Sequence, residues 1–313
     1  MENLLEIRNL SIDAKIDNNF YNIIKDIDIR VKKGEMVGIV GESGSGKTIT
    51  SLAIIKLLEK NLFIKNGEII FEGKNIMELD DDEMRKLRGR EISFVFQEVL
   101  TALNPVMDIE TQVSEVLIHH RICDKERAIQ KTTKILKELG IPLDKLKHYP
   151  HNFSGGQRQR ILIAISLIGD PKLIIADEPT TALDVITQIE ILKILKKIKE
   201  EGKSIILITH NISIVRNFSD YVYIMYLGEI MESGKTLDVM SNPIHPYTKL
   251  LLNSIVTLEK KDRLKPIEGN IPSIYEIPTG CRFITRCPFK TDKCIKEPPI
   301  KNKEGRYFRC WNV

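Results

Sequence analysis

The chain has 313 residues, of which 42% are hydrophobic and 29% are charged, and its formal net charge is +4. This length exceeds that of one ordinary domain, so we expect a large core with a smaller appended region. The small net charge does not indicate nucleic acid as a partner. No apolar run reaches the roughly eighteen residues that span a bilayer, and the N-terminus lacks a secretory pattern, so a cytosolic location is expected.

A phosphate-binding loop is the first chemical motif along the chain. Residues 41–48, GESGSGKT, match the pattern G-x-x-x-x-G-K-[ST] between a strand-like run at 36–40 and a helix-like run at 50–58. In this context backbone N–H groups wrap phosphates, and the helix N-terminus adds positive potential. Lys47 is expected to reach the β- and γ-phosphates of a nucleotide, and Thr48 to bind Mg²⁺. The other loop residues expected at the nucleotide are Gly41, Ser43, Gly44, Ser45 and Gly46.

Two later patterns complement this loop. The run 171–178 is apolar and strand-like, and it ends in Asp177 and Glu178. At the carboxyl end of a parallel strand, Asp177 would hold Mg²⁺ through water and Glu178 would polarise an attacking water. Upstream, Ser154 is a natural N-cap that precedes two glycines and an apolar-striped helix, which predicts a second anion-binding helix end.

The order of these motifs over residues 1–235 resembles that of the nucleotide-binding subunits of ABC transporters. Walker A (GESGSGKT) precedes a Q-loop glutamine, the signature FSGGQ, Walker B (LIIADE), a D-loop (ALD) and a switch histidine at the end of ILITH. The resemblance implies an α/β fold, the P-loop NTPase cassette of ABC ATPases. Its parts would be a RecA-like core, an antiparallel β subdomain and a helical subdomain at about 98–165.

The resemblance also implies a head-to-tail dimer that sandwiches two ATP molecules. Each ATP would contact Walker A of one chain and the signature of the other. Glu178 would be the catalytic base, His210 would stabilise the γ-phosphate, and Gln97 would sense it and contribute to the Mg²⁺ site. The signature residues implied at the nucleotide are Ser154, Gly155, Gly156 and Gln157.

The sequence departs from the family pattern at two places. Asn211 follows the switch histidine, where an acidic residue is usual. Ala14 lies near the position of the aromatic residue that stacks on adenine. Two alternatives stay open for Phe20 and Tyr21: one of them stacks on adenine in its place, or both only pack in the core or a loop. Neither departure alters the expectation of an active ATPase.

The remaining motifs point to one branch of the family. Residues 97–113 resemble the segment after the Q-loop in peptide and nickel importers. Residues 242–252 and 269–289 resemble the C-terminal extension of oligopeptide and dipeptide importer ATPases, which here would cover 236–313. The chain is therefore expected to power import of di- or oligopeptides. The alternatives are a nickel importer ATPase, a non-transport ABC ATPase and a regulatory module without catalysis.

The partners implied by this resemblance are proteins rather than nucleic acid. A second ABC ATPase, either a related chain or a second copy, would complete the dimer. Two membrane permease subunits would bind the pair, and an extracytoplasmic peptide-binding protein would act indirectly. The chain would then be peripheral, at the cytoplasmic face of the cell membrane.

Four of the five cysteines lie in the extension, with the spacing C-x5-C-x6-C-x15-C; these are Cys281, Cys287, Cys294 and Cys310. The spacing lacks the short C-x₂₋₄-C knuckle of structural zinc sites, and cytosolic disulfides are rare. An iron–sulfur cluster, zinc and unmetallated thiols all remain open on spacing alone. The family resemblance implies a [4Fe–4S] cluster, whose charge would be offset by Arg282, Arg286, Lys290 and Lys293. Cys123 stands alone and is expected to be an inert thiol.

Overall fold

The computed structural model describes residues 2–254 and 267–313. The chain divides into two compact units. Unit 1 comprises residues 1–2, 32–35 and 78–207, and unit 2 comprises residues 3–31, 36–77 and 208–313. Within the described ranges, every helix is too short or too polar to cross a bilayer.

Unit 1 combines parallel strands with a group of helices. β6 (Ile92–Val95) pairs in parallel with β7 (Leu173–Asp177), with Ile92 opposite Leu173. β7 in turn neighbours β8 (Ser204–Thr209), whose first four residues belong to this unit. Every residue of β7 and β8 is buried, which is typical of parallel strands covered on both faces.

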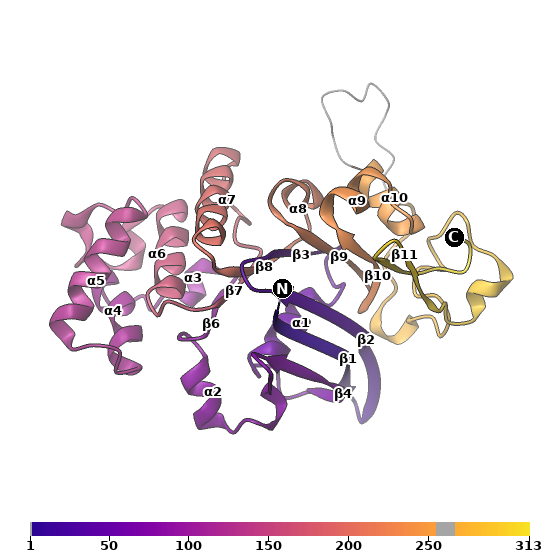
Figure 1. Cartoon of the computed structure of the whole chain (residues 1–313), viewed down its shortest axis with the longest axis horizontal. Helices are drawn as coiled ribbons and strands as arrows, with labels where there is room; N and C mark the ends of the chain where they lie inside the picture. Colours follow the sequence, from indigo (N-terminus) through magenta and orange to yellow (C-terminus); the bar gives the residue numbers. More distant parts are fainter. Residues whose placement is uncertain (1, 255–266) are drawn as a thin grey trace. The chain divides into compact units, whose positions relative to one another are not determined.

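The helices of unit 1 begin at residues that suit a helix N-terminus. They are α2 (Asp81–Leu87), α3 (Val99–Ala102), α4 (Ile109–His119), α5 (Lys125–Glu138), α6 (Gly155–Leu167) and α7 (Val185–Glu200), with short 3₁₀ turns at Leu143–Lys145 and Pro150–Asn152. Side-chain oxygens of Asp80, Asp108, Asp124, Ser154 and Asp184 accept from backbone N–H groups of the following turns. α4, α5 and α6 pack against one another (Figure 1).

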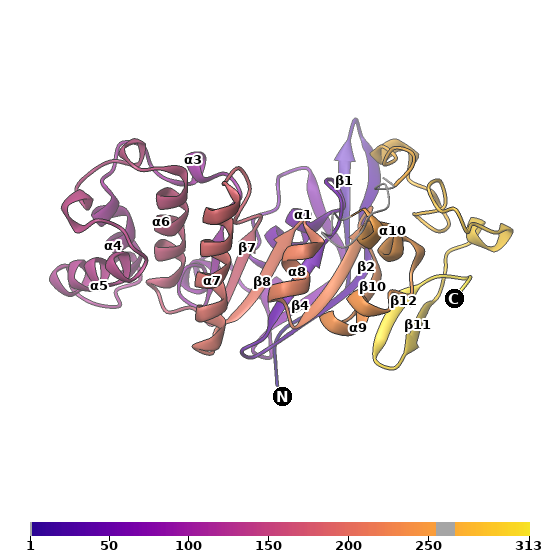
Figure 2. The ribbon, with the colours of Figure 1, turned by 90° about the horizontal axis from the view of Figure 1, so that it is seen from above.

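Unit 2 contains two sheets. The first has the strand order β11 (Ile300–Lys303), β12 (Arg306–Arg309), β10 (Glu229–Lys235), β9 (Tyr221–Tyr226) and β3 (Met36–Val40). Only β3 and β9 pair in parallel in this part of the sheet; the other neighbours are antiparallel. The C-terminal hairpin therefore extends the sheet of the phosphate-loop strand, as Figure 2 shows beside β10.

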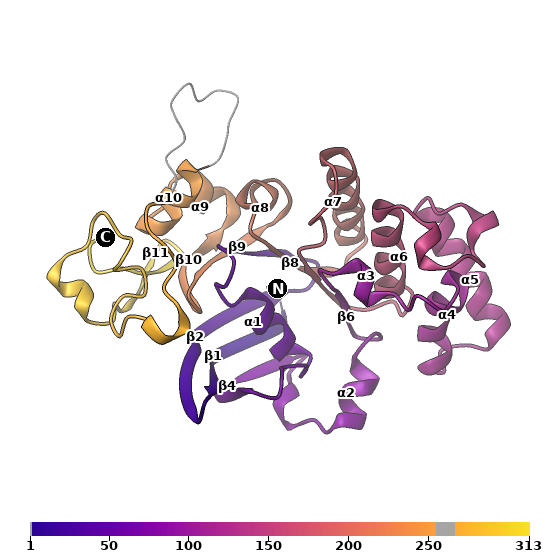
Figure 3. The ribbon, with the colours of Figure 1, turned by 180° about the vertical axis from the view of Figure 1, so that it is seen from behind.

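The second sheet is antiparallel, with the order β2 (Asn19–Lys32), β1 (Asn3–Ile16), β4 (Leu62–Phe71) and β5 (Lys74–Asn75) (Figure 3). Helices complete the unit. They are α1 (Lys47–Ile54), α8 (Ile212–Phe218), α9 (Thr236–Ser241) and α10 (Pro246–Asn253), with 3₁₀ turns at Ile76–Glu78, Ile274–Glu276 and Asp292–Ile295.

The C-terminal extension shares its apolar core with the sheet of β9 and β10. Tyr226 of β9, Tyr247 of α10 and Phe283 of the extension are fully buried. Their ring centroids lie 4.8 to 5.2 Å apart, and the Tyr226 and Phe283 rings meet edge to face. Large aromatic side chains thus pack the extension against β9 and α10 within unit 2.

Candidate functional site

The phosphate loop joins β3 to α1 in unit 2, as the sequence predicts. Its glycines are required by close approaches of the backbone. A Cβ atom at Gly41 would lie 2.0 Å from the Met225 carbonyl oxygen. Gly46, at the N-cap of α1, has a left-handed φ of 96°, and a Cβ there would lie 2.4 Å from Ile24 Cδ1. A larger residue at either position would displace the loop.

Lys47 holds the loop in its curled conformation. Its Nζ donates to the carbonyl oxygens of Gly41 and Glu42, both at 2.9 Å, and to Ser45 Oγ at 3.3 Å. The Lys47 side chain is buried, whereas Ser43, Gly44 and Thr48 are exposed. The exposed part of the loop therefore carries backbone N–H groups and the Thr48 hydroxyl, which are groups suited to binding phosphate and Mg²⁺.

The acidic pair lies at the carboxyl end of β7 in unit 1. Asp177 is the last residue of the strand and is buried, and Glu178 follows with a left-handed φ of 46°. The Glu178 carboxylate accepts from Thr181 Oγ1 at 2.7 Å. A non-glycine residue in this conformation is strained, and such strain gathers at functional sites.

Gln97 shares that edge of the strands. It is exposed and comes two residues after the end of β6, and β6 runs parallel to β7. Parallel strands end at one common edge, so the structure brings Gln97 to the edge where Asp177 and Glu178 lie. Carboxylate and amide oxygens at one edge suit a hard cation such as Mg²⁺.

The predicted N-cap of the second helix end is confirmed. Ser154 Oγ accepts from Gln157 N at 3.3 Å, and Gln157 Oε1 accepts from Ser154 N at 3.1 Å, which makes a reciprocal capping box. Ser154 and Gly155 are exposed. The first turn of α6 can therefore offer backbone N–H groups to an anion outside the unit.

His210 is exposed and follows β8 directly. The next residue, Asn211, caps α8, because its Oδ1 accepts from Ser213 N at 3.0 Å. Asparagine caps a helix as well as an acidic residue does. The departure from the family pattern at Asn211 therefore leaves the helix start after His210 intact.

Both aromatic residues considered as adenine partners contact another aromatic ring in unit 2. Phe20 is 61% exposed and meets Phe63 edge to face, with centroids 6.2 Å apart. Tyr21 meets Tyr275 of the extension, with centroids 5.2 Å apart. Ala14 is buried. Stacking of Phe20 or Tyr21 on adenine stays a prediction.

The expectation of an iron–sulfur cluster is wrong. Among residues 2–254 and 267–313, no three Cys, His, Asp or Glu side chains gather as a metal site, and all five cysteines are free thiols. Cys281 and Cys294 are buried in the apolar core, and burial raises the pKa of Cys281 to about 12. Metal binding requires the thiolate, which this environment opposes. The same finding removes support for zinc.

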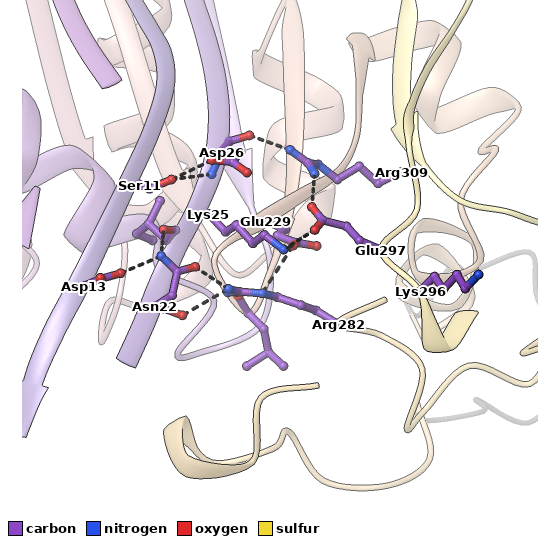
Figure 4. Close-up of polar contacts among 12 residues, drawn as sticks. Ser11, Asp13, Asn22, Lys25, Asp26, Glu229, Arg282, Lys296, Glu297 and Arg309 are labelled. Carbon is purple, nitrogen blue, oxygen red and sulfur yellow. Dashed lines mark hydrogen bonds and ion pairs between the residues drawn. The ribbon is translucent and has the colours of Figure 1, made fainter. Parts of the chain in front are cut away.

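Two arginines expected to offset a cluster's charge are used otherwise. Arg282 lies 3.4 Å from Glu229, and Arg286 lies 2.6 Å from Glu42. Arg309 donates to the Asp26 carbonyl oxygen at 2.6 Å and pairs with Glu297. Figure 4 shows the contacts of Arg282 and Arg309, which join the extension to β2 and β10 and were not predicted from the sequence.

Comparisons with known proteins agree with the motif order. The family model "ABC transporter" matches residues 24–181, and the model "Oligopeptide/dipeptide transporter, C-terminal region" matches residues 231–294. The oligopeptide transport ATP-binding protein AppD of Bacillus subtilis is 41% identical, over 99% of this chain and 97% of AppD. The dipeptide transport ATP-binding protein DppD of the same organism is 40% identical, over 99% and 95% of the two chains.

Solved structures confirm the expected cassette fold. A dimeric ATP-binding cassette in a post-hydrolysis state, bound to ADP and Pi, is similar with a TM-score of 0.67 at 31% identity. The similarity covers 74% of this chain and 98% of that cassette.

Proposed function

Because this chain belongs to the ABC transporter family and carries its oligopeptide/dipeptide C-terminal region, we propose that it is the ATP-hydrolysing subunit that powers import of di- and oligopeptides. The observation that carries the proposal is likeness over nearly the whole chain to peptide-transport ATP-binding proteins, at about 40% identity. The likeness includes the extension as well as the cassette. We also propose the division into a cassette, 1–235, with its helical subdomain at about 98–165, and an extension, 236–313.

In the proposed reaction each motif has one task. The phosphate loop binds the triphosphate through its backbone N–H groups and Lys47. Thr48, Gln97 and Asp177 are the proposed Mg²⁺ ligands, Asp177 through water. When bound, Mg²⁺ would neutralise charge on the β- and γ-phosphates.

Hydrolysis needs a base and stabilisation of the transferred group. Glu178 would take a proton from water as the water oxygen bonds to the γ-phosphorus and the bond to the β-phosphate oxygen breaks, giving ADP and phosphate. His210 would donate a hydrogen bond to the γ-phosphate. The exposed, capped start of α6 would contact the nucleotide of a partner chain through the signature residues.

The proposed assembly is supported by the exposed start of the signature helix and by the likeness to peptide-transport ATP-binding proteins. A second ABC ATPase, either a related chain or a second copy, completes the nucleotide sites. Two permease subunits bind the pair at the cytoplasmic face of the cell membrane. An extracytoplasmic peptide-binding protein delivers the substrate to the permease.

The experiment compares the wild-type chain with Glu178→Gln and Lys47→Ala. Glu178→Gln should bind MgATP normally and hydrolyse it at least about 100-fold more slowly, since it lacks the base. Lys47→Ala should weaken nucleotide binding itself. Wild-type turnover by Glu178→Gln would overturn the assignment of the base.

The substrate is tested in cells that lack the chain. Uptake of a labelled peptide should be lost, restored by the wild-type chain and not restored by Glu178→Gln. Loss of nickel uptake with intact peptide uptake would instead place the chain in a nickel importer.

A further inference from the structure

One side chain of the extension reaches the phosphate loop. The Arg286 guanidinium donates to both carboxylate oxygens of Glu42, from Nη1 to Oε2 at 2.6 Å and from Nη2 to Oε1 at 3.1 Å. Glu42 is the second residue of the loop, 244 positions away in sequence. Parallel contacts of this kind are stronger and more directional than single hydrogen bonds.

Arg286 is held in place by groups on its other side. Its Nε donates to the Glu268 carbonyl oxygen at 3.1 Å, and Nη2 donates to the Ile267 carbonyl oxygen at 3.3 Å. Its guanidinium carbon lies 5.7 Å from the Tyr226 ring centroid, within the range of a cation–π contact. The Arg286 side chain is only 4% exposed. The guanidinium therefore has little freedom to leave Glu42.

Glu42 is also held through its backbone. Its N–H donates to the Tyr247 hydroxyl at 3.2 Å. Its carbonyl oxygen accepts from Lys47 Nζ at 2.9 Å and from Ser45 N at 3.2 Å. Residue 42 thus joins α10 and the extension to the lysine that is expected to bind phosphate. A shift of Glu42 would move the carbonyl oxygen that helps to orient Lys47.

We infer that Arg286 is a positioning residue through which the C-terminal extension fixes the phosphate loop and thereby sets the affinity for the nucleotide. The inference rests on the proposed function, because it assumes that the loop binds ATP. Arg286 would act by orienting Glu42, whose carbonyl oxygen accepts from Lys47, rather than by binding the nucleotide itself.

Another arginine of the extension provides a matched control. Arg309 is also buried, donates to the Asp26 carbonyl oxygen of β2 and pairs with Glu297 at 3.4 Å. None of the described contacts of Arg309 involves residues 41–48. Arg309→Lys and Arg286→Lys both keep a positive charge and remove a planar guanidinium, so they disturb the extension in comparable ways.

The test measures equilibrium binding of MgATP to the purified full chain, per folded molecule, with folding checked by circular dichroism. Arg286→Met should raise the Kd about tenfold, near the lower end of what a hydrogen bond to a charged group contributes. Arg286→Lys should give an intermediate Kd, and Arg309→Lys should bind like the wild type. In steady-state hydrolysis, KM should rise in the Arg286 variants more than kcat falls.

Glu42→Gln disturbs the same pair from its other side, so it tests the inference even if an Arg286 variant folds poorly. Glu42→Gln should weaken binding, and Glu42→Gln with Arg286→Met should be no weaker than the worse single variant, because both act through one pair. Wild-type affinity in Arg286→Met, or equal weakening in Arg309→Lys and Arg286→Lys, would overturn the inference. A wild-type chain that fails to bind MgATP would instead refute the proposed function.

Discussion

Arg282 Nε lies 3.4 Å from Glu229 Oε1 in unit 2, and the two side chains are only 4% and 1% exposed. The guanidinium also donates to the Leu227 carbonyl oxygen, and to the Asn22 side-chain oxygen at 2.7 Å. Burial raises the pKa of Glu229 and lowers the pKa of Arg282, and the partner's charge opposes the shift in each case. Each charge is therefore tolerated in the interior because the other is present.

Removing one member of this pair should be costly. Arg282→Met leaves the Glu229 carboxylate buried without its main partner, so we expect a loss of about 3–5 kcal/mol in the free energy of unfolding. Denaturation by urea, followed by circular dichroism, measures this loss. The double variant Arg282→Met, Glu229→Gln should recover much of it, because the second change removes the stranded charge. Losses that simply add in the double variant would show that the two groups are not coupled.

The signature helix, α6, approaches α7 so closely that Gly156 has no room for a larger residue. A Cβ atom at Gly156 would lie 2.6 Å from Thr187 Cγ2 of α7. Thr187 cannot easily turn aside, because its N–H and hydroxyl both donate to the Asp184 carboxylate, at 3.0 and 2.6 Å. A Cβ at Gly155 would meet only Leu183 Cδ2, at an ordinary 3.5 Å.

Gly156→Ala should therefore destabilise the chain by about 1–2 kcal/mol, since overpacking outweighs the gain in helix propensity. Thermal or urea unfolding measures the change. Adding Thr187→Ser removes the crowding methyl group and keeps the hydroxyl bond to Asp184, so it should restore stability. Gly155→Ala is the control and should have little effect. Equal losses at the two glycines would point to backbone conformation rather than crowding.

The parts of the site that sequence predicts are those determined by neighbouring residues. The strand, loop and helix around residues 41–48 form where expected, because the glycine pattern and the flanking apolar runs act locally. The Ser154 cap is confirmed for the same reason, since both bonds of its capping box span three residues.

The contacts of the extension could not be predicted in this way. Arg286 and Glu42 are 244 positions apart, and Arg282 and Asn22 are 260 apart. A basic residue in a sequence has many acidic residues as candidate partners, and only the fold selects one. The prediction of a metal cluster is wrong for a related reason: the spacing of cysteines does not reveal whether a thiol faces a ligand or, as Cys281 does, an apolar core.

The stability of the chain should depend on pH through His245, which lies in unit 2. It is almost fully buried and caps α10, where its Nδ1 accepts from Tyr247 N at 3.0 Å. Burial lowers its pKa from the ordinary 6.5 to about 3, and nearby Lys249 adds to the effect. Neighbouring Glu232, whose carboxylate accepts from His245 N, has the opposite tendency, because burial raises its pKa.

The direction of this pH dependence follows from how readily His245 binds a proton in the unfolded and in the folded chain. Between pH 6.5 and about 3, the unfolded chain binds a proton at this residue and the folded chain does not. Acid therefore stabilises the unfolded state, and the His245 contribution to stability should fall by about 1.4 kcal/mol per pH unit in this window. Glu232 contributes in the other direction, since the folded chain binds its proton more readily above pH 4.5.

Comparison with His245→Asn separates the histidine from these carboxyl groups, because asparagine retains a cap acceptor and does not titrate. The free energy of unfolding should be measured by urea denaturation for both chains from pH 7 to pH 4.5. The wild-type chain should lose stability more steeply than the variant below pH 6.5, because only the wild type has the histidine. A difference between the two chains that stays constant with pH would show that His245 binds its proton equally well in the folded state.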